Sequence, residues 1–175
     1  MRLFFAINFS EETRARLLKL RDEIQARSRY GRFCRSENLH LTLAFLGECN
    51  AEQLAAAKSA LDAVSFEPFT VSINRAGRFS RGGGALWWAG IRDNAALSKL
   101  QGELSARLRE AGFTIESRAF SPHITIGREV SGDFEQGKFE PFEDTVASVE
   151  LMKSENIRGT LTYTAIYTKQ AGRRS

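Results

Sequence analysis

His40-Leu41-Thr42-Leu43 and His123-Ile124-Thr125-Ile126 repeat one pattern of polar and apolar residues, and they contain the only two histidines of the 175-residue chain. Strict alternation of this kind predicts a half-buried β-strand. Successive side chains of a strand point to opposite faces, so the histidine and threonine of each stretch share a face. The sequence therefore predicts two imidazole–hydroxyl pairs on the solvent-facing sides of two strands, with the leucines in one core and the isoleucines in another.

The two stretches belong to a longer internal duplication. A strand over 3–9, a helix, Arg35 and the first histidine correspond in order to a strand over 86–91, a helix, Arg118 and the second histidine. The two arginines, like the two histidines, are 83 residues apart. Two copies are too few for a repeat array. The pattern instead predicts an α+β fold of two pseudo-symmetric lobes, in which two mainly antiparallel β-sheets line a central cleft and the helices lie outside.

Apolar periodicity and capping residues predict three helices. The expected helices are one from Ser10 to Arg27, one over 51–64 after Asn50, and one from Asp93 or Asn94 to Gly112. The stretch 75–84 combines arginines with three consecutive glycines and predicts a mobile, basic loop. A second long loop is predicted over 131–144, before two closing strands.

The composition is that of a folded globular chain, because 42% of the residues are hydrophobic and 26% are charged. The length suits one domain, so we expect residues 1–175 to form a single domain of two intertwined lobes. No apolar run approaches the roughly 20 residues that span a bilayer, and the first apolar run is too short for a signal peptide. We therefore expect a cytoplasmic monomer with no membrane contact.

The net charge and the number of cysteines limit which partners and cofactors are expected. A formal charge of +4 and a pI near 9.3 fit a phosphate-bearing partner such as RNA, although many proteins without such a partner share them. Cys34 and Cys49 are the only cysteines, which is too few for a disulfide framework, so we expect free thiols. Structural zinc usually takes four Cys or His ligands, and the chain has four in total. No metal or other cofactor is expected.

Two histidines that face each other across a cleft suit a displacement at phosphorus that needs no metal ion. Imidazole titrates near neutral pH, so one ring takes a proton from the attacking oxygen while the other protonates the leaving oxygen. Thr42 and Thr125 are predicted to donate hydrogen bonds to non-bridging phosphoryl oxygens, and Arg128 to hold the phosphate. A lone histidine on a strand is usually structural, but the duplicated context favours catalysis for this pair.

Further side chains are candidates for contact with a nucleic acid. Arg35 and Arg118 precede their histidine strands at matching distances, and we expect Arg118 to bind substrate. The aromatic candidates for stacking on a base, which also suit core packing, are Phe45, Trp87, Trp88 and Phe120. The basic candidates for an RNA backbone, which also suit a solvated surface, are Arg78, Arg81 and Lys153.

The residues 40–47, His-Leu-Thr-Leu-Ala-Phe-Leu-Gly, and 121–128, Ser-Pro-His-Ile-Thr-Ile-Gly-Arg, resemble the paired motifs of the two-histidine (2H) phosphoesterases. More closely, the chain resembles the RNA 2′,3′-cyclic phosphodiesterases, also known as the bacterial 2′–5′ RNA ligases. The opening Arg-Leu-Phe-Phe-Ala-Ile over 2–7, Asn-Leu-His over 38–40 and Arg-Ala-Phe over 118–120 extend the resemblance over nearly the whole chain. One motif alone is a weak signal, but the pair at this spacing is specific.

The resemblance implies hydrolysis of a terminal 2′,3′-cyclic phosphate of RNA, tRNA fragments among the candidates, to a 2′-phosphomonoester. It also implies weak joining of RNA ends through a 2′–5′ bond in reverse. On this model His40 protonates the departing 3′ oxygen, His123 activates water, and Thr42 and Thr125 bind the phosphate. The family often has a bulkier residue in place of Gly127.

The residues themselves do not assign acid and base to the two histidines. Two alternatives also remain open: a cyclic phosphodiesterase that acts on a small nucleotide, and a basic module that binds RNA ends without turnover.

Overall fold

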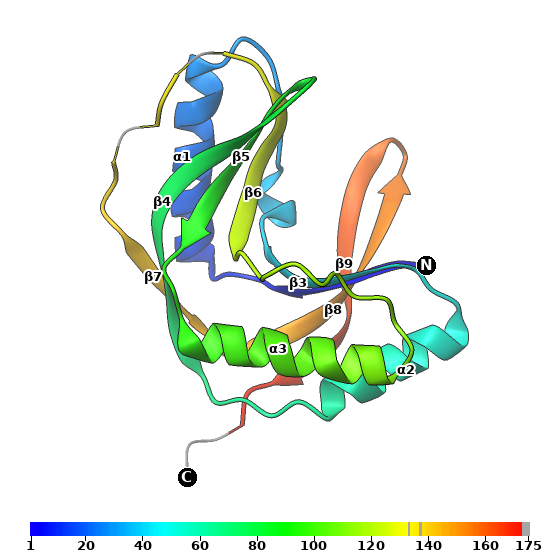
Figure 1. Ribbon diagram of the computed structural model, residues 1–175. Coiled ribbons are helices and arrows are strands. Elements are labelled where there is room, and N and C mark those ends of the chain that lie inside the picture. Colours follow the sequence, from blue (N-terminus) through cyan, green and yellow to red (C-terminus); the bar gives the residue numbers. More distant parts are fainter. Residues whose placement is uncertain (133, 137, 173–175) are drawn as a thin grey trace.

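The strands form one curled, wholly antiparallel sheet in the computed structural model, which describes residues 1–132, 134–136 and 138–172, the side chain of residue 81 excepted (Figure 1). The strands are β1 (Arg2–Ile7), β2 (Arg32–Phe33), β3 (Leu41–Glu48), β4 (Phe69–Arg81), β5 (Gly84–Ile91), β6 (His123–Val130), β7 (Phe142–Val146), β8 (Ser148–Ile157) and β9 (Thr160–Gln170). Their order is β7-β4-β5-β6-β3-β1-β8-β9, and β2 pairs with β6. The helices are α1 (Glu11–Arg27), α2 (Ala51–Asp62), α3 (Ala95–Glu110) and the short 3-10 helix η1 (Ser36–Asn38).

Two halves of the sheet meet at a single pair of residues. Strands β3, β1, β8 and β9 form one half, and β6, β5, β4 and β7 form the other. Between them, Leu41 of β3 and Ile124 of β6 are the paired residues. Figure 1 shows the β4–β5 and β8–β9 hairpins on either side of this junction. The expected duplicated α+β fold is confirmed. The two expected sheets are halves of one sheet, which is continuous through this pair of residues.

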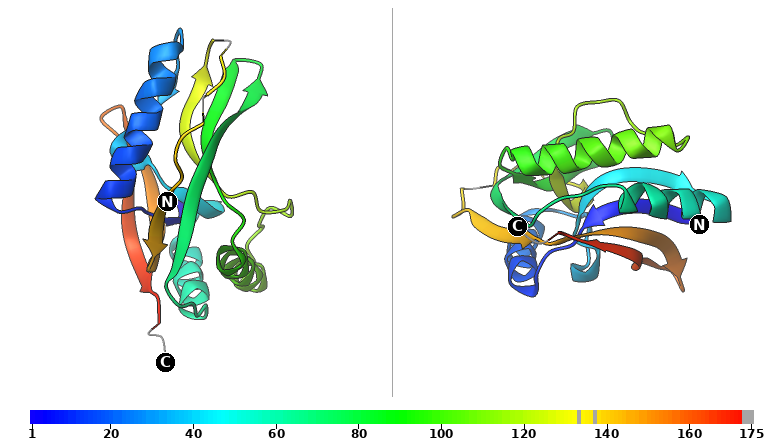
Figure 2. Two further views of the ribbon diagram at one scale, coloured as in Figure 1. Left: turned by 90° about the vertical axis from the view of Figure 1, so that its left-hand side faces the viewer. Right: turned by 90° about the horizontal axis from the view of Figure 1, so that it is seen from below.

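The predicted helix starts are confirmed by their caps. Ser10 accepts a hydrogen bond from the backbone N–H of Thr13 at 3.3 Å, and Asn94 accepts one from Leu97 at 3.0 Å. Gly112 follows α3 with a φ of +94°, which glycine adopts without strain. Two of the helices, α2 and α3, lie side by side in both views of Figure 2. The helices therefore begin where the sequence predicts.

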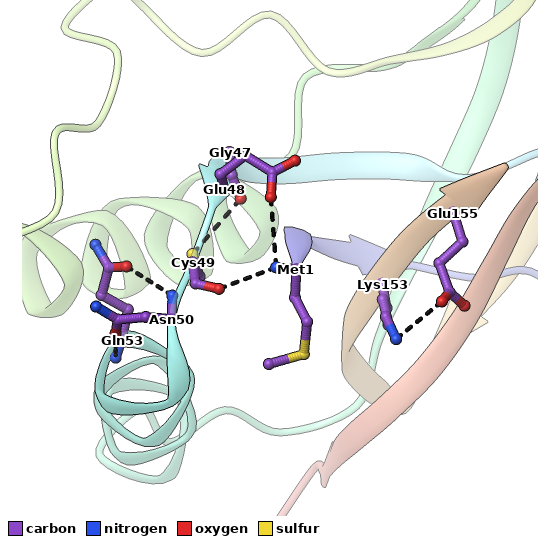
Figure 3. Close-up of polar contacts among 8 residues, drawn as sticks. All are labelled: Met1, Gly47, Glu48, Cys49, Asn50, Gln53, Lys153 and Glu155. Atoms are coloured by element: carbon purple, nitrogen blue, oxygen red, sulfur yellow. Dashed lines mark hydrogen bonds and ion pairs between the residues drawn. The ribbon is translucent and has the colours of Figure 1, made fainter.

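The N-terminus is tied to the end of β3 (Figure 3). The amino group of Met1 donates to the carbonyl of Cys49 at 3.0 Å and lies 3.4 Å from the carboxylate of Glu48. The adjacent Asn50 and Gln53 form a capping box at the start of α2, with two reciprocal hydrogen bonds of 2.8 Å. These contacts fix β1 along β3, and β1 carries a phenylalanine that packs on the first histidine.

One core, rather than two, lies beneath the histidine strands. Leu41, Leu43, Ile124 and Ile126 are all buried, as the alternation predicts, but they belong to a single continuous cluster. The expectation of separate cores was wrong because β3 and β6 adjoin, which makes their buried faces one surface. The histidine and threonine faces of the two strands are brought together for the same reason.

The stretch 75–84 is a hairpin, not the expected loop. Strand β4 continues to Arg81 and turns at residues 82–83 into β5. Gly77 is paired with Trp88, and a Cβ at that glycine would overlap the indole ring. The glycines and arginines of this stretch predicted a loop. In the structure Gly77 instead leaves space for Trp88 of the neighbouring strand, and β4 remains a strand.

Candidate active site

The two histidine–threonine pairs line one cavity of about 690 Å³ between the halves of the sheet, here called the central cavity. Its lining residues come from β1, β2, β3, β6, β8, β9 and the segment that includes η1. They are Arg2, Phe4, Arg32, Phe33, Cys34, Arg35, Asn38, His40, Thr42, Phe45, His123, Thr125, Arg128, Ser154, Glu155, Asn156, Leu161 and Tyr163. The structure thus brings together both histidines, both threonines and Arg128.

Both imidazole rings are held in the same way. His40 Nδ1 lies 2.7 Å from the carbonyl of Asn38, and His123 Nδ1 lies 2.8 Å from the carbonyl of Ser121. A carbonyl oxygen only accepts hydrogen bonds, so Nδ1 of each ring carries the hydrogen. The Nε2 atom of each ring is therefore the nitrogen available for proton exchange with a substrate.

His40 is packed by two aromatic rings, one from β1 and one from β9. The Phe4 ring lies 4.9 Å from the imidazole, and the Tyr163 ring meets it edge-on at 5.2 Å. Asn38, whose carbonyl holds the ring, is itself buried and donates through its side chain to the carbonyl of Leu161 at 3.0 Å. The orientation of His40 is thus fixed by residues of β1, η1 and β9.

Burial lowers the pKa of His40 below its usual value. The carbonyl of Asn38 opposes this by raising the pKa, while the positive charges of Arg128 and of a protonated His123 lower it further. The ring is therefore neutral near pH 7 in the unliganded protein. Its Nε2 then accepts a hydrogen bond from the Thr42 hydroxyl, 2.8 Å away.

The central cavity is rich in positive charge. Four arginines line it, Arg2, Arg32, Arg35 and Arg128, with Glu155 as the one carboxylate among the described lining residues. Salt bridges pair Arg32 with Glu129 at 2.9 Å and Arg35 with Glu37 at 3.1 Å. Arg128 has no carboxylate partner among the residues that the structure describes, so its charge is available to a phosphate.

Arg118 lies apart from the central cavity. It lines a second cavity of about 620 Å³, together with Thr42, Leu43, Ala44, Phe45, Phe79, Leu86, Gln101, Thr114, Ile115, Glu116, Ala119, Phe120, Ser121 and His123. Phe45, Thr42 and His123 border both cavities. Although Arg35 and Arg118 match in the duplication, they therefore lie in different cavities.

Both tryptophans lie outside the two cavities. Trp87 is 2% exposed and stacks on Phe134 at 5.0 Å, which places it in the core. Trp88 packs on Phe79 at 5.5 Å, and neither indole borders the central or the second cavity. Core packing, the alternative considered from the sequence, explains Trp87, whereas Trp88 is only half-buried.

Two of the three remaining basic candidates have local partners. Arg78 donates to the carbonyl of Phe134 at 2.7 Å, and Lys153 pairs with Glu155 at 2.9 Å (Figure 3). The side chain of Arg81 lies outside the described residues.

Several cavity residues were not selected from the sequence. Tyr163, in the C-terminal strand, has no motif around it and is placed only by the pairing of β9 with β8. Asn38 did have a signal, because it stands two residues before the first histidine. Gly127 gives space to Phe33: a Cβ there would lie 2.9 Å from the Phe33 ring. The Phe33 ring therefore occupies the space that a side chain larger than glycine would take at position 127.

Three further observations complete the description of the molecule. Cys34 and Cys49 are free thiols, as expected. Within the described ranges, no three side chains of His, Cys, Asp or Glu gather in a way that would hold a metal ion. Across the same ranges, every helix is too short or too polar to cross a membrane.

A curled antiparallel sheet with a duplicated His-x-Thr strand at its centre defines the two-histidine class of phosphoesterases. A family model described as "LigT like Phosphoesterase" matches residues 7–87 and 90–163. The chain belongs to the LigT-like phosphoesterase family.

Relatives and solved structures agree with this assignment. The RNA 2′,3′-cyclic phosphodiesterase of Escherichia coli K12 is 34% identical over 131 residues, which cover 74% of this chain and 73% of the relative. That of Archaeoglobus fulgidus is 33% identical over 129 residues, covering 73% and 72%. A crystal structure of E. coli LigT complexed with 3′-AMP is 29% identical, with a TM-score of 0.87 and 98% of each chain covered.

Proposed function

We propose that this protein hydrolyses the 2′,3′-cyclic phosphate at the end of an RNA to a 2′-phosphomonoester by acid–base catalysis without a metal ion. The observation that carries the proposal is the pair of histidines in one cavity, each held through Nδ1 with Nε2 left for proton exchange. The relatives named RNA 2′,3′-cyclic phosphodiesterase support the substrate. We further propose that residues 1–175 act as one catalytic domain.

In this mechanism His123 is the base and His40 the acid. His123 Nε2 takes a proton from water as the water oxygen bonds to phosphorus. The bond from phosphorus to the 3′ oxygen breaks, and His40 Nε2 donates its proton to that oxygen. The two histidines exchange protonation states, and solvent restores them. The 2′ oxygen keeps the phosphate, which gives a 2′-phosphomonoester.

The threonines and Arg128 stabilise the negative charge of the reacting phosphate. The hydroxyls of Thr42 and Thr125 donate to non-bridging oxygens, where charge gathers in the transition state. For Thr42 this requires a turn of the hydroxyl away from His40 Nε2, its acceptor in the unliganded protein. The guanidinium of Arg128 pairs with the same phosphate.

A bound phosphate also makes His40 able to act as the acid. In the unliganded protein burial lowers the pKa of His40, and Arg128 and His123 lower it further. A negatively charged cyclic phosphate between these groups favours the imidazolium form of His40. It offsets the effect of the positive charges of Arg128 and His123 on the pKa of that ring. Substrate binding therefore helps to protonate the ring that must give up its proton.

The arginines of the central cavity favour a polyanionic substrate. Four guanidinium groups against one lining carboxylate suit an RNA strand, whose phosphates continue beyond the reacting end. We propose that the same centre also joins a 2′,3′-cyclic end to a 5′-hydroxyl end through a 2′–5′ bond, because a 5′-hydroxyl can replace water as the group that His123 deprotonates.

The test uses an oligonucleotide with a 2′,3′-cyclic phosphate end, in the presence of a chelator. We expect a 2′-phosphomonoester product, and we expect His40→Asn and His123→Asn each to slow turnover by about 100-fold or more. Gln170→Ala, an exposed change on β9 outside the central cavity, is the control and should have wild-type turnover.

Three results would contradict the proposal. Dependence on added metal would exclude the two-histidine mechanism, a 3′-phosphate product would reverse the assigned bond cleavage, and full activity in both histidine variants would exclude the site. A protein that binds the RNA and leaves its end intact would be a binding module.

A further inference from the structure

The second cavity adjoins the catalytic pair on one side only. His123 borders both cavities, whereas His40 borders the central cavity alone. A group in the second cavity therefore lies against His123, while His40 takes no part in the lining. In the proposed mechanism His123 receives the proton of the attacking oxygen, so the second cavity adjoins the position of the attacking group.

The two cavities differ in charge. The central cavity has four arginines and one glutamate, as described above. The charged side chains that line the second cavity are Arg118 and Glu116, which form an ion pair with each other. A phosphate-rich strand therefore fits the central cavity, while an uncharged group fits the second cavity better.

Aromatic side chains give the second cavity a surface for a planar ring. Phe45 and Phe79 line it and are 51% and 41% exposed, which is unusual for phenylalanine in a folded protein. Phe79 also meets the imidazole of His123 edge-on at 6.0 Å. Exposed aromatic faces beside a reactive group are a common way to stack a nucleic-acid base. A flat, neutral ring near His123 thus matches the cavity.

We propose that the second cavity binds an uncharged nucleoside end whose 5′-hydroxyl replaces the attacking water. This inference rests on the proposed function. His123 Nε2 takes the proton of the 5′-hydroxyl, and that oxygen bonds to phosphorus. The bond to the 3′ oxygen breaks, and His40 donates the proton that this oxygen needs. The product is a 2′–5′ phosphodiester, and the occupant of the second cavity decides between joining and hydrolysis.

The test fills the second cavity without touching either histidine. Ala119 and Thr114 are exposed residues of its lining, so Ala119→Trp and Thr114→Trp should fold and block it. Ala106→Trp, at an exposed position of α3 outside both cavities, is the matched control. The substrates are an RNA with a 2′,3′-cyclic end and, in millimolar excess, a dinucleotide with a free 5′-hydroxyl. One reaction yields both the joined and the hydrolysed product.

We expect both blocking variants to lower the ratio of joined to hydrolysed product by about tenfold or more, while Ala106→Trp retains the wild-type ratio. An unchanged ratio would overturn the inference, as would a wild-type protein that forms no joined product. If the second cavity holds the penultimate nucleotide instead, the variants will slow hydrolysis of a cyclic-ended dinucleotide more than that of a cyclic mononucleotide. A wild-type protein that hydrolyses neither would instead refute the proposed function.

Discussion

Leu41 and Ile124 face each other across the junction of the two sheet halves, and they relate the two histidine motifs by a local two-fold axis. An antiparallel register through this pair sets His40 level with Thr125 and Thr42 level with His123. The backbone pairing of these two buried residues therefore aligns the candidate active site.

Leu41→Ala should destabilise the protein by about 2–5 kcal/mol, because Leu41 is fully buried and its removal leaves a cavity at the junction. Chemical denaturation measures the change. Ile157→Ala, at a residue 47% exposed, should alter the unfolding free energy by no more than about 0.5 kcal/mol. Equal effects of the two substitutions would contradict the central role of the Leu41–Ile124 contact.

The pKa of His40 should lie below the ordinary histidine value of about 6.5, chiefly because the ring is buried. With only two histidines in the chain, NMR titration of the ring C–H resonances yields two curves, and His40→Asn assigns them. Addition of 2′-AMP should move the His40 midpoint to higher pH, because a bound anion favours the imidazolium. A midpoint at or above 6.5 in the unliganded protein would contradict the burial argument.

Arg128→Gln should raise the pKa of His40, since the guanidinium charge is one of the groups that lower it. The same substitution should weaken 2′-AMP binding by about 10- to 100-fold, the usual effect of losing a charged hydrogen bond. NMR titration and calorimetry measure the two effects. Arg109→Gln, at an exposed residue of α3, is the control and should alter neither. A normal affinity in Arg128→Gln would exclude Arg128 from phosphate binding.

Thr42→Val should lower kcat/KM for a cyclic phosphate by on the order of 100-fold, because it removes a hydroxyl donor to the transition state and keeps the β-branched shape. Thr42→Ser retains the hydroxyl and should lose much less. The corresponding Thr164→Val, at an exposed position of β9, should have no effect. Similar rates for Thr42→Val and Thr42→Ser would show that the hydroxyl takes no part.

The strongest sequence signals were local ones, and the structure confirms the features that depend on them. Ser10, Asn50 and Asn94 cap their helices because a side-chain oxygen reaches an N–H only three residues away. The stretch 75–84 was misread for a related reason. The strand role of Gly77 depends on Trp88, a residue of the next strand, and no local pattern reveals such a partner.

The sequence by itself determined the duplicated His-x-Thr strands and which of their residues are buried, because alternation along a strand sets the face of every side chain. Only the tertiary structure decided that β3 and β6 adjoin over one core, that Tyr163 packs on His40, and that Arg35 and Arg118 lie in different cavities. Those relationships arise from contacts between strands far apart in the chain. Long-range pairing, rather than local propensity, therefore builds the site from its two predicted halves.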